Sequence, residues 1–265
     1  MIFRWNAETI HFNAEGAGPP LVLLHGLGGN ADNWLPQRAV LKHDHLVLSL
    51  DLPGHGRSSG REVRFADYWQ VIEALLDHLE LDSAALCGLS KGARAGLALA
   101  SRRPGRVERM IVVNAFVHLT PADKARRLAL YDLLAEPGGM TLWAQTLLDW
   151  MGVSDRPVIV RGFMKSLATL DPAHIRRIFG ELSAYDQRPE LAEIVCPVLL
   201  VRGQKDGFVP DYCVEDLARC LPDSRIVRMP ECGHLPYLEQ SISFNQIAAA
   251  FLGDGSSHSA RSASN

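Results

Sequence analysis

The chain has 265 residues, of which 47% are hydrophobic, and a formal net charge of −3 at pH 7. A chain of this length can bury a large core as a single domain with an insertion. Its positive and negative charges nearly balance, so it lacks the strongly basic composition of proteins that bind nucleic acid or anionic membranes. We therefore expect no nucleic acid and no membrane as partners. Independently of the charge, we expect a small-molecule substrate and a monomer or homodimer.

Five cysteines are spread along the chain without the spacing of a metal site or a disulfide framework: Cys87, Cys196, Cys213, Cys220 and Cys232. Their number is odd, and no two of them form a C-x-x-C pair. The first residues lack the apolar run of a signal peptide, and no uncharged apolar stretch has membrane-spanning length. The sequence therefore predicts a reduced, cytoplasmic protein without a metal or another cofactor.

The first half of the chain predicts strands that alternate with helices. Residues 2–13 alternate apolar and polar side chains and predict an antiparallel hairpin or edge strands. Parallel strands that are buried on both faces appear as continuous apolar runs. Such runs lie at 21–24, 46–50, 85–87 and 107–113, with helices expected at 31–41, at 65–79 and after Ser90 up to 103. This alternation indicates a mostly parallel sheet covered by helices on both faces.

The alternation stops after residue 114. From there the sequence predicts helices without strands, at 122–135, 140–151, 157–170 and 173–185. We interpret 118–188 as a helical cap, or lid, inserted into a core formed by 1–117 and 189–252. Most aromatic residues of this segment are expected to form the apolar faces of packed helices, whereas we expect Trp143 and Trp150 to line a substrate pocket beneath the cap.

Strands and helices resume after the predicted cap. Strands are expected at 198–203 and 225–229, and helices at 211–221 and 242–252. Residues 253–265 are rich in Ser and Gly and predict a disordered tail.

Gly88-Leu89-Ser90-Lys91-Gly92 matches the pattern G-x-S-x-G between a predicted strand and a predicted helix. A turn this sharp leaves no room for side chains at Gly88 and Gly92, and it exposes the serine hydroxyl above the end of the sheet. The serine also lies at a helix N-terminus, where free N–H groups favour a nearby negative charge. Such a short pattern also occurs by chance, so the interpretation of Ser90 as a nucleophile depends on the rest of the chain.

Asp206 and His234 are the partners that a serine nucleophile requires. Each of the three residues follows a predicted strand, and sites in parallel sheets form at the carboxyl ends of the strands. The order serine, acid, histidine is the one expected with G-x-S-x-G. His234 would accept the serine proton and return it to the leaving group, while Asp206 would fix the imidazole tautomer. His55, which lies in a turn, is the alternative base.

The tetrahedral intermediate of such a reaction needs two N–H donors for its oxyanion. We assign them to the backbone N–H groups of Lys91, which follows the nucleophile, and of Leu27, in the glycine-rich loop 25–30. This loop lacks the G-x-x-x-x-G-K-[ST] pattern of a phosphate-binding loop. We expect His25 to brace it.

Five motifs in this order resemble those of α/β-hydrolase-fold enzymes over residues 1–252: His25-Gly26, Asp51-x-Pro-Gly-His-Gly-x-Ser58, Gly88-x-Ser90-x-Gly92, Gly203-x-x-Asp206 and Gly233-His234. The resemblance implies an eight-stranded sheet with a helical cap inserted after the sixth strand. Within the family, the chain is similar to small esterases, lactonases and C–C hydrolases, including 3-oxoadipate enol-lactone hydrolases and the aminoacrylate hydrolases of pyrimidine breakdown. Epoxide hydrolases and haloalkane dehalogenases carry an aspartate nucleophile, so Ser90 argues against both of these activities.

The resemblance therefore implies a serine hydrolase that cleaves a small ester, lactone or related acyl compound through an acyl-enzyme on Ser90. Alternatives on the same site are C–C hydrolysis of a diketo acid, perhydrolysis and acyl transfer. A non-catalytic binding module usually has a broken triad or oxyanion loop, and the presence of all the expected residues argues against it. Relatives usually carry an uncharged residue where this chain has Lys91. We expect its ammonium group to bind a carboxylate-bearing substrate; otherwise the side chain pairs with a structural carboxylate or extends into solvent.

Overall fold

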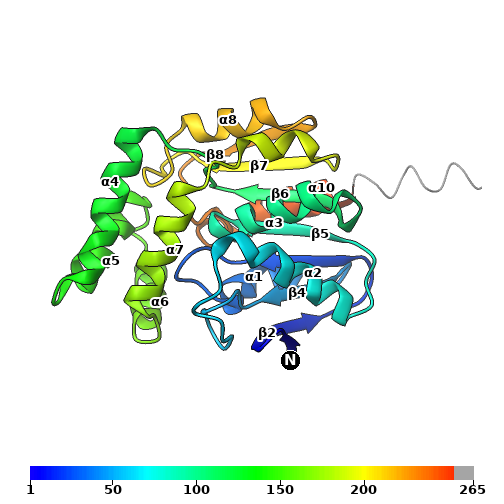
Figure 1. Cartoon of the computed structure of the whole chain (residues 1–265). Coiled ribbons are helices and arrows are strands. Elements are labelled where there is room, and N and C mark those ends of the chain that lie inside the picture. Colours follow the sequence, from blue (N-terminus) through cyan, green and yellow to red (C-terminus); the bar gives the residue numbers. More distant parts are fainter. Residues whose placement is uncertain (254–265) are drawn as a thin grey trace, which may run out of the picture.

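The computed structural model describes residues 1–253, in which eight strands form one sheet (Figure 1). The strand order is β1-β2-β4-β3-β5-β6-β7-β8. β2 is antiparallel to its neighbours β1 and β4, and the strands from β3 to β8 run parallel to one another. The strands are β1 (Ile2–Trp5), β2 (Glu8–Glu15), β3 (Pro20–Leu24), β4 (Leu46–Leu50), β5 (Ala84–Leu89), β6 (Val107–Val113), β7 (Val198–Gly203) and β8 (Ser224–Met229). The predicted mostly parallel, eight-stranded sheet is confirmed.

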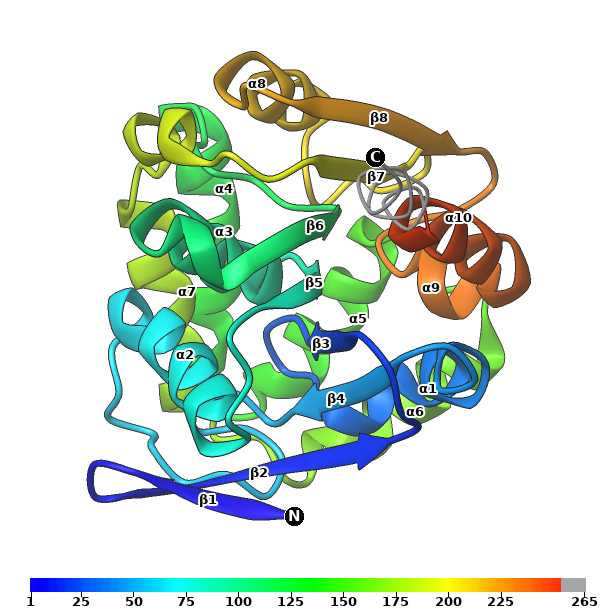
Figure 2. The same ribbon diagram turned by 90° about the vertical axis from the view of Figure 1, so that its right-hand side faces the viewer.

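Helices cover both faces of the sheet. Figure 2 shows α2, α3 and α8 on one side of it and α1, α9 and α10 on the other. Their bounds are α1 (Leu35–Leu41), α2 (Tyr68–His78), α3 (Lys91–Arg102), α8 (Tyr212–Cys220), α9 (Pro236–Glu239) and α10 (Ser241–Gly253). The two-sided cover explains why the central strands are apolar along their whole length.

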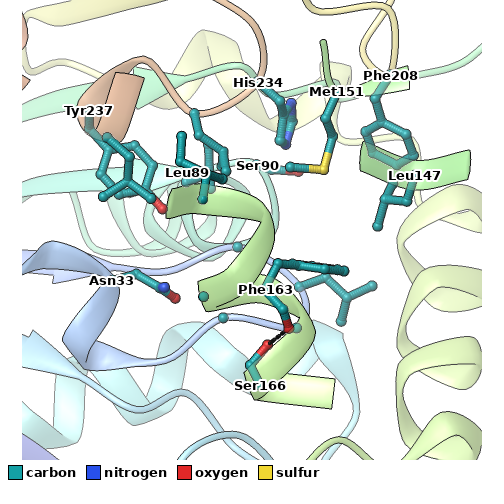
Figure 3. A pocket seen from close by; sticks show the side chains of 18 of the residues that line it. Asn33, Leu89, Ser90, Leu147, Met151, Phe163, Ser166, Phe208, His234 and Tyr237 are labelled. Carbon is teal, nitrogen blue, oxygen red and sulfur yellow. Dashed lines mark hydrogen bonds between the residues drawn. The ribbon is translucent and has the colours of Figure 1, made fainter. Parts of the chain in front are cut away.

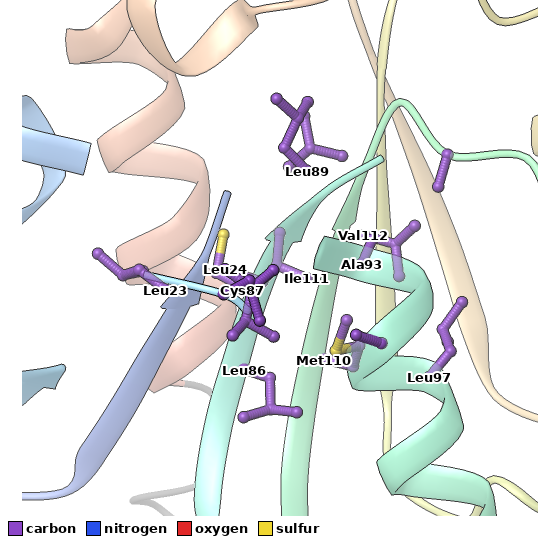
Figure 4. Close-up of a cluster of buried hydrophobic side chains, with 14 of the residues drawn as sticks. Leu23, Leu24, Leu86, Cys87, Leu89, Ala93, Leu97, Met110, Ile111 and Val112 are labelled. Atoms are coloured by element: carbon purple, nitrogen blue, oxygen red, sulfur yellow. The ribbon is translucent and has the colours of Figure 1, made fainter. Parts of the chain in front are cut away.

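The helix α3 packs closely on the centre of the sheet because its inner face carries small side chains. A Cβ on Gly96 would lie only 2.7 Å from the Cε atom of Met110 on β6. Figure 4 shows Ala93 and Leu97 of this helix beside Met110 and Val112. This packing fixes the start of α3, and therefore the position of the residue before it, against the sheet.

Four helices between β6 and β7 form a cap at one end of the sheet (Figure 1). They are α4 (Pro121–Asp132), α5 (Gly139–Trp150), α6 (Pro157–Leu167) and α7 (Pro172–Ala184). Side chains of Thr120 and Asp171 accept hydrogen bonds from N–H groups in the first turns of α4 and α7. The cap follows the sixth strand, as the resemblance implies.

Some helical segments differ from the sequence-based expectation. Residues 31–41 form a 3₁₀ turn at Ala31–Trp34 before α1 begins, and the third cap helix ends at Leu167 instead of 170. The helix α9 was not predicted, because four residues are too few for a helical periodicity to appear.

The C-terminal boundary shifts by one residue. Gly253 belongs to α10 and not to the predicted tail, and the rest of that tail, 254–265, lies outside the described residues. Within the described part of the chain, no helix combines the length and the apolar character needed to cross a membrane.

Candidate active site

Ser90 stands on a sharp turn between β5 and α3. Its φ of 48° and ψ of −108° are a strained combination for a residue with a side chain. A Cβ on Gly88 would lie 2.5 Å from the backbone nitrogen of Ala93, and a Cβ on Gly92 would lie 2.3 Å from the carbonyl oxygen of Leu24. Glycine is therefore required on both sides, and the G-x-S-x-G segment has the strand–turn–helix form expected from the sequence.

Asp206 and His234 form a buried pair in the loops after β7 and β8. Their hydrogen bond, between His234 Nδ1 and Asp206 Oδ2, measures 2.7 Å. The other carboxylate oxygen accepts the backbone N–H groups of Phe208 and Val209, at 2.9 and 3.1 Å. With the carboxylate fixed in this way, Nδ1 carries the proton and Nε2 is the basic nitrogen of the ring.

Ser90 and His234 line the same cavity, which has a volume of about 540 Å³ and lies between the core and the cap. Figure 3 shows the two side chains close together, with Met151 beside them. Within residues 1–253 no hydrogen bond joins them, and such bonds often tighten only when substrate binds. The structure thus brings together the three residues that the sequence predicts as a triad.

The loop after β3 carries the second predicted oxyanion donor, Leu27, into the cavity wall. His25 braces this loop: its Nδ1 donates to the carbonyl oxygen of Gly26 at 2.7 Å, and its Nε2 accepts the N–H of Leu52 at 3.0 Å. Burial, together with nearby Lys91, holds the pKa of His25 well below its usual value, so the ring stays neutral. The N–H of Lys91 is the first of α3 and has no carbonyl within the helix to bond.

Apolar side chains form most of the cavity wall. Residues of α1 and α9 and of the cap helices α4, α5, α6 and α7 contribute to it, together with Phe116 and Phe208. The residues of the wall that carry a side chain beyond Cα, in addition to Ser90 and His234, are Leu27, Asp32, Asn33, Leu35, Pro36, Leu89, Phe116, Tyr131, Leu147, Met151, Val158, Ile159, Phe163, Ser166, Phe179, Leu182, Phe208, Leu235, Tyr237 and Leu238. In the described part of the chain, the wall contains neither lysine nor arginine.

A family model described as the alpha/beta hydrolase family matches residues 21–245. The chain belongs to the alpha/beta hydrolase family. This hydrolase is 30% identical over 252 residues to a pimeloyl-[acyl-carrier protein] methyl ester esterase from Nitrosomonas europaea, a match that covers 89% of this chain and 97% of that protein. It is equally similar, at 30% over 262 residues, to a dihydrolipoyllysine-residue acetyltransferase component of an acetoin cleaving system from Pseudomonas putida, but spans only 66% of that protein's length.

Among solved structures, the hydrolase is similar to an enol-lactonase from Burkholderia xenovorans LB400. The TM-score is 0.84 and the sequence identity 26%, with 96% of this chain and 100% of that chain covered. The prediction of a hydrolase related to esterases and lactonases is therefore confirmed at the level of the family.

The predicted role of the Lys91 side chain is wrong. The side chain is only 1% exposed and lies outside the cavity, with Nζ 3.2 Å from Nε2 and 3.3 Å from Nδ1 of His55 and 5.3 Å from the centre of the Tyr68 ring. It neither pairs with a structural carboxylate nor extends into solvent. Because its side chain is buried outside the cavity, Lys91 would offer the site only its backbone N–H.

The predicted pocket residues Trp143 and Trp150 do not line the cavity. Trp143 is 1% exposed and packs between Tyr131 and Phe163, at centroid distances of 5.6 and 5.9 Å. Trp150 lies beneath the guanidinium group of Arg126, 4.3 Å from it. Both are packing residues of the cap, the interpretation that the sequence had favoured for most aromatic residues there.

His55, the alternative base, is also excluded by position. Its Nδ1 donates to the Pro53 carbonyl at 2.9 Å, and the ring lies outside the cavity, against Lys91. Burial and the neighbouring lysine hold its pKa well below the usual value.

Sequence reasoning missed two residues that hold the acid and the histidine loop. Arg202 Nη1 donates to Asp206 Oδ2 at 2.9 Å, and both side chains are almost fully buried. Asn114, at the end of β6, donates from Nδ2 to the carbonyl oxygens of Gly233 and His234, at 3.0 Å each. Asn114 has a positive φ of 41°, which no sequence motif signals.

Proposed function

We propose that this protein hydrolyses a small carboxylic ester or lactone through an acyl-enzyme on Ser90. The observation that carries the proposal is the hydrogen-bonded pair of Asp206 and His234 beside a serine on a strained turn, all at one cavity. Its relatives named as an esterase and an enol-lactonase support the same class of reaction.

In the first step, Oγ of Ser90 attacks the ester carbonyl while His234 Nε2 takes the hydroxyl proton. Asp206 stabilises the imidazolium that forms, without accepting the proton itself. The oxyanion receives hydrogen bonds from the N–H groups of Leu27 and Lys91, each worth about 3 kcal/mol of barrier height. Collapse of the intermediate breaks the bond to the alcohol, and His234 protonates that leaving group.

In the second step, a water molecule takes the place of the alcohol. His234 removes a proton from it, the resulting hydroxide attacks the acyl carbonyl, and the serine leaves with the proton returned by His234. The products are the carboxylic acid and the free enzyme. For a lactone the alcohol and the acid are parts of one molecule.

Labelling with a fluorophosphonate probe tests the assignment. We expect a single adduct on Ser90, found by peptide mass spectrometry, and loss of both labelling and ester hydrolysis in Ser90→Ala. Ser166→Ala is the matched control, because Ser166 is the other serine of the cavity wall. It should still be labelled at Ser90. An adduct on Ser166, or hydrolysis by folded Ser90→Ala at the wild-type rate, would contradict the proposal.

A further inference from the structure

Tyr131 lies in the last turn of α4 and is held by other aromatic rings. It is 3% exposed, and its ring stacks on that of Phe179, at a centroid distance of 3.7 Å and an interplanar angle of 2°. The edge of Trp143 closes a second side at 5.6 Å, and Phe208 packs at 6.4 Å. The ring therefore has little freedom, and the position of its hydroxyl group is set by the packing of the cap.

Tyr131 lines the cavity, and its hydroxyl group has no hydrogen-bond partner among residues 1–253. The tyrosines outside the cavity wall differ in this respect: Tyr68 donates to the Pro53 carbonyl, Tyr185 to Glu190, and Tyr212 to Asp123. The hydroxyl group of Tyr237, the other tyrosine of the cavity wall, also has no hydrogen-bond partner among the described residues. Neither hydroxyl oxygen is among the fully buried polar atoms of the described residues that lack a partner, so both remain accessible. The two cavity tyrosines are therefore suited to bond a molecule that enters the cavity.

The charges around the cavity restrict what that molecule can be. Among residues 1–253, its wall holds no lysine or arginine and a single carboxylate, Asp32, which is half exposed and paired with Arg38 and Arg57. A substrate carboxylate beneath the cap would therefore be buried without a counter-charge, which is strongly unfavourable. An uncharged oxygen avoids this cost and still accepts the phenolic hydrogen bond. Burial raises the pKa of the Tyr131 hydroxyl above its ordinary value, so the group remains a donor.

We propose that Tyr131 is a specificity-determining residue that donates a hydrogen bond to an uncharged ketone or ether oxygen in the apolar acyl chain of the substrate. The substrate class is thus a neutral ester with an oxygen-bearing chain, and not a carboxylate-bearing one. The inference rests on the proposed function, since it assumes that the chain enters the cavity as part of an ester that Ser90 attacks. Figure 3 shows how Leu147, Phe208 and Met151 line the wall beside Ser90 on the cap side, where such a chain would lie.

A matched series of para-nitrophenyl esters tests the proposal. It contains the octanoyl ester, three oxo-octanoyl esters with the ketone at the fourth, fifth or sixth carbon, and the monoester of octanedioic acid. For each enzyme the readout is the ratio of kcat/KM for the best oxo ester to kcat/KM for the octanoyl ester, because this ratio cancels general effects on catalysis. The variants are Tyr131→Phe, Tyr237→Phe and Tyr212→Phe. Tyr212 bonds the same helix, α4, from outside the cavity.

We expect Tyr131→Phe to lower the ratio about 5- to 10-fold, the value of one neutral hydrogen bond, while Tyr212→Phe keeps the wild-type ratio. The octanedioic monoester should be the poorest substrate of the wild-type enzyme. An unchanged ratio in folded Tyr131→Phe, or a fall confined to Tyr237→Phe or Tyr212→Phe, overturns the role of Tyr131. A preference for the octanedioic monoester overturns the substrate class.

The same measurements separate this inference from the proposed function. If the wild-type enzyme hydrolyses the octanoyl ester but Tyr131→Phe leaves the kcat/KM ratio unchanged, the proposed function stands and the role of Tyr131 is refuted. If the wild-type enzyme hydrolyses none of the esters and is not labelled at Ser90, both the proposed function and the role of Tyr131 are refuted.

Discussion

The Lys91 side chain is buried outside the cavity, so we expect it to affect the stability of the fold and not the binding of the substrate. Burial holds the pKa of its amine well below the ordinary value of 10.5, and nearby Asp51 opposes only part of this shift. Between the lowered pKa of the native lysine and 10.5, the native chain binds fewer protons at this group than the unfolded chain. Stability should therefore rise with pH until the unfolded lysine also loses its proton near 10.5.

Lys91→Met should remove this pH dependence. In urea titrations at several pH values, we expect the unfolding free energy of the wild type to rise relative to that of the variant from neutral pH to pH ~10, by about 1.4 kcal/mol for each unit of pKa shift. Thiols and other groups titrate in both proteins, so the difference isolates Lys91. Lys205→Met is the control, because Lys205 is half exposed. If the unfolding free energies of wild type and Lys91→Met changed with pH in parallel, the prediction would be contradicted, because the buried amine would then be charged in the native state.

At the scale of the helix, the cap is attached to the core through α3. Arg94, in the first turn of that helix, is 1% exposed and donates to the carbonyl oxygens of Leu182 and Tyr185 at the end of α7, at 2.6 Å each. It also bonds Gln187, which returns a bond to the Arg94 carbonyl. Burial lowers the pKa of its guanidinium to about 10, so the group is still charged at neutral pH. These bonds satisfy carbonyls that a helix end leaves free.

Arg94→Met should cost about 3 kcal/mol of stability, because two buried carbonyls lose their donor. It should also raise KM, since α7 supplies Phe179 and Leu182 to the cavity wall. Thermal unfolding and steady-state kinetics measure the two effects. Arg102→Met offers the comparison, because its exposed ion pair with Glu190 is worth less than about 1 kcal/mol. Equal losses in the two variants would refute a special role for the buried arginine.

The sequence predicts strands and loop residues better than the faces of the cap helices. Buried parallel strands are continuous apolar runs, and catalytic residues in the loops after them are marked by glycine patterns, so Ser90, Asp206 and His234 could be located without a structure. A cap helix carries apolar residues on more than one side. Which of them faces the substrate depends on how the helices pack on each other. For this reason the sequence does not distinguish Trp143 and Trp150, which pack within the cap, from Tyr131 and Phe163, which line the wall.

At the scale of the whole molecule, the strand order brings the proposed triad together. β5, β6, β7 and β8 are consecutive neighbours in the sheet, so the loops after β5, β7 and β8 end at one edge. β6 lies between the serine strand and the acid strand, and its last residue is followed by Asn114. That side chain accepts the N–H of Gly203 at 3.0 Å and donates to the Gly233 and His234 carbonyls. One amide thus connects the ends of three strands.

Asn114→Asp tests this connection without removing the acceptor. The aspartate keeps an oxygen for the N–H of Gly203 but loses the donor to the histidine loop, so the imidazole of His234 should move while β7 stays in place. We expect kcat to fall by on the order of 10²-fold, the effect of misplacing a catalytic group by about 1 Å.

Asn114→Ala loses all of these bonds, and its free energy of unfolding should be lower by about 3 kcal/mol. Circular dichroism and thermal unfolding separate the two variants. A folded Asn114→Asp with wild-type kcat would mean that the remaining bonds of the histidine loop, among them those from Gly233 and Leu235 to Glu239, hold His234 without the amide.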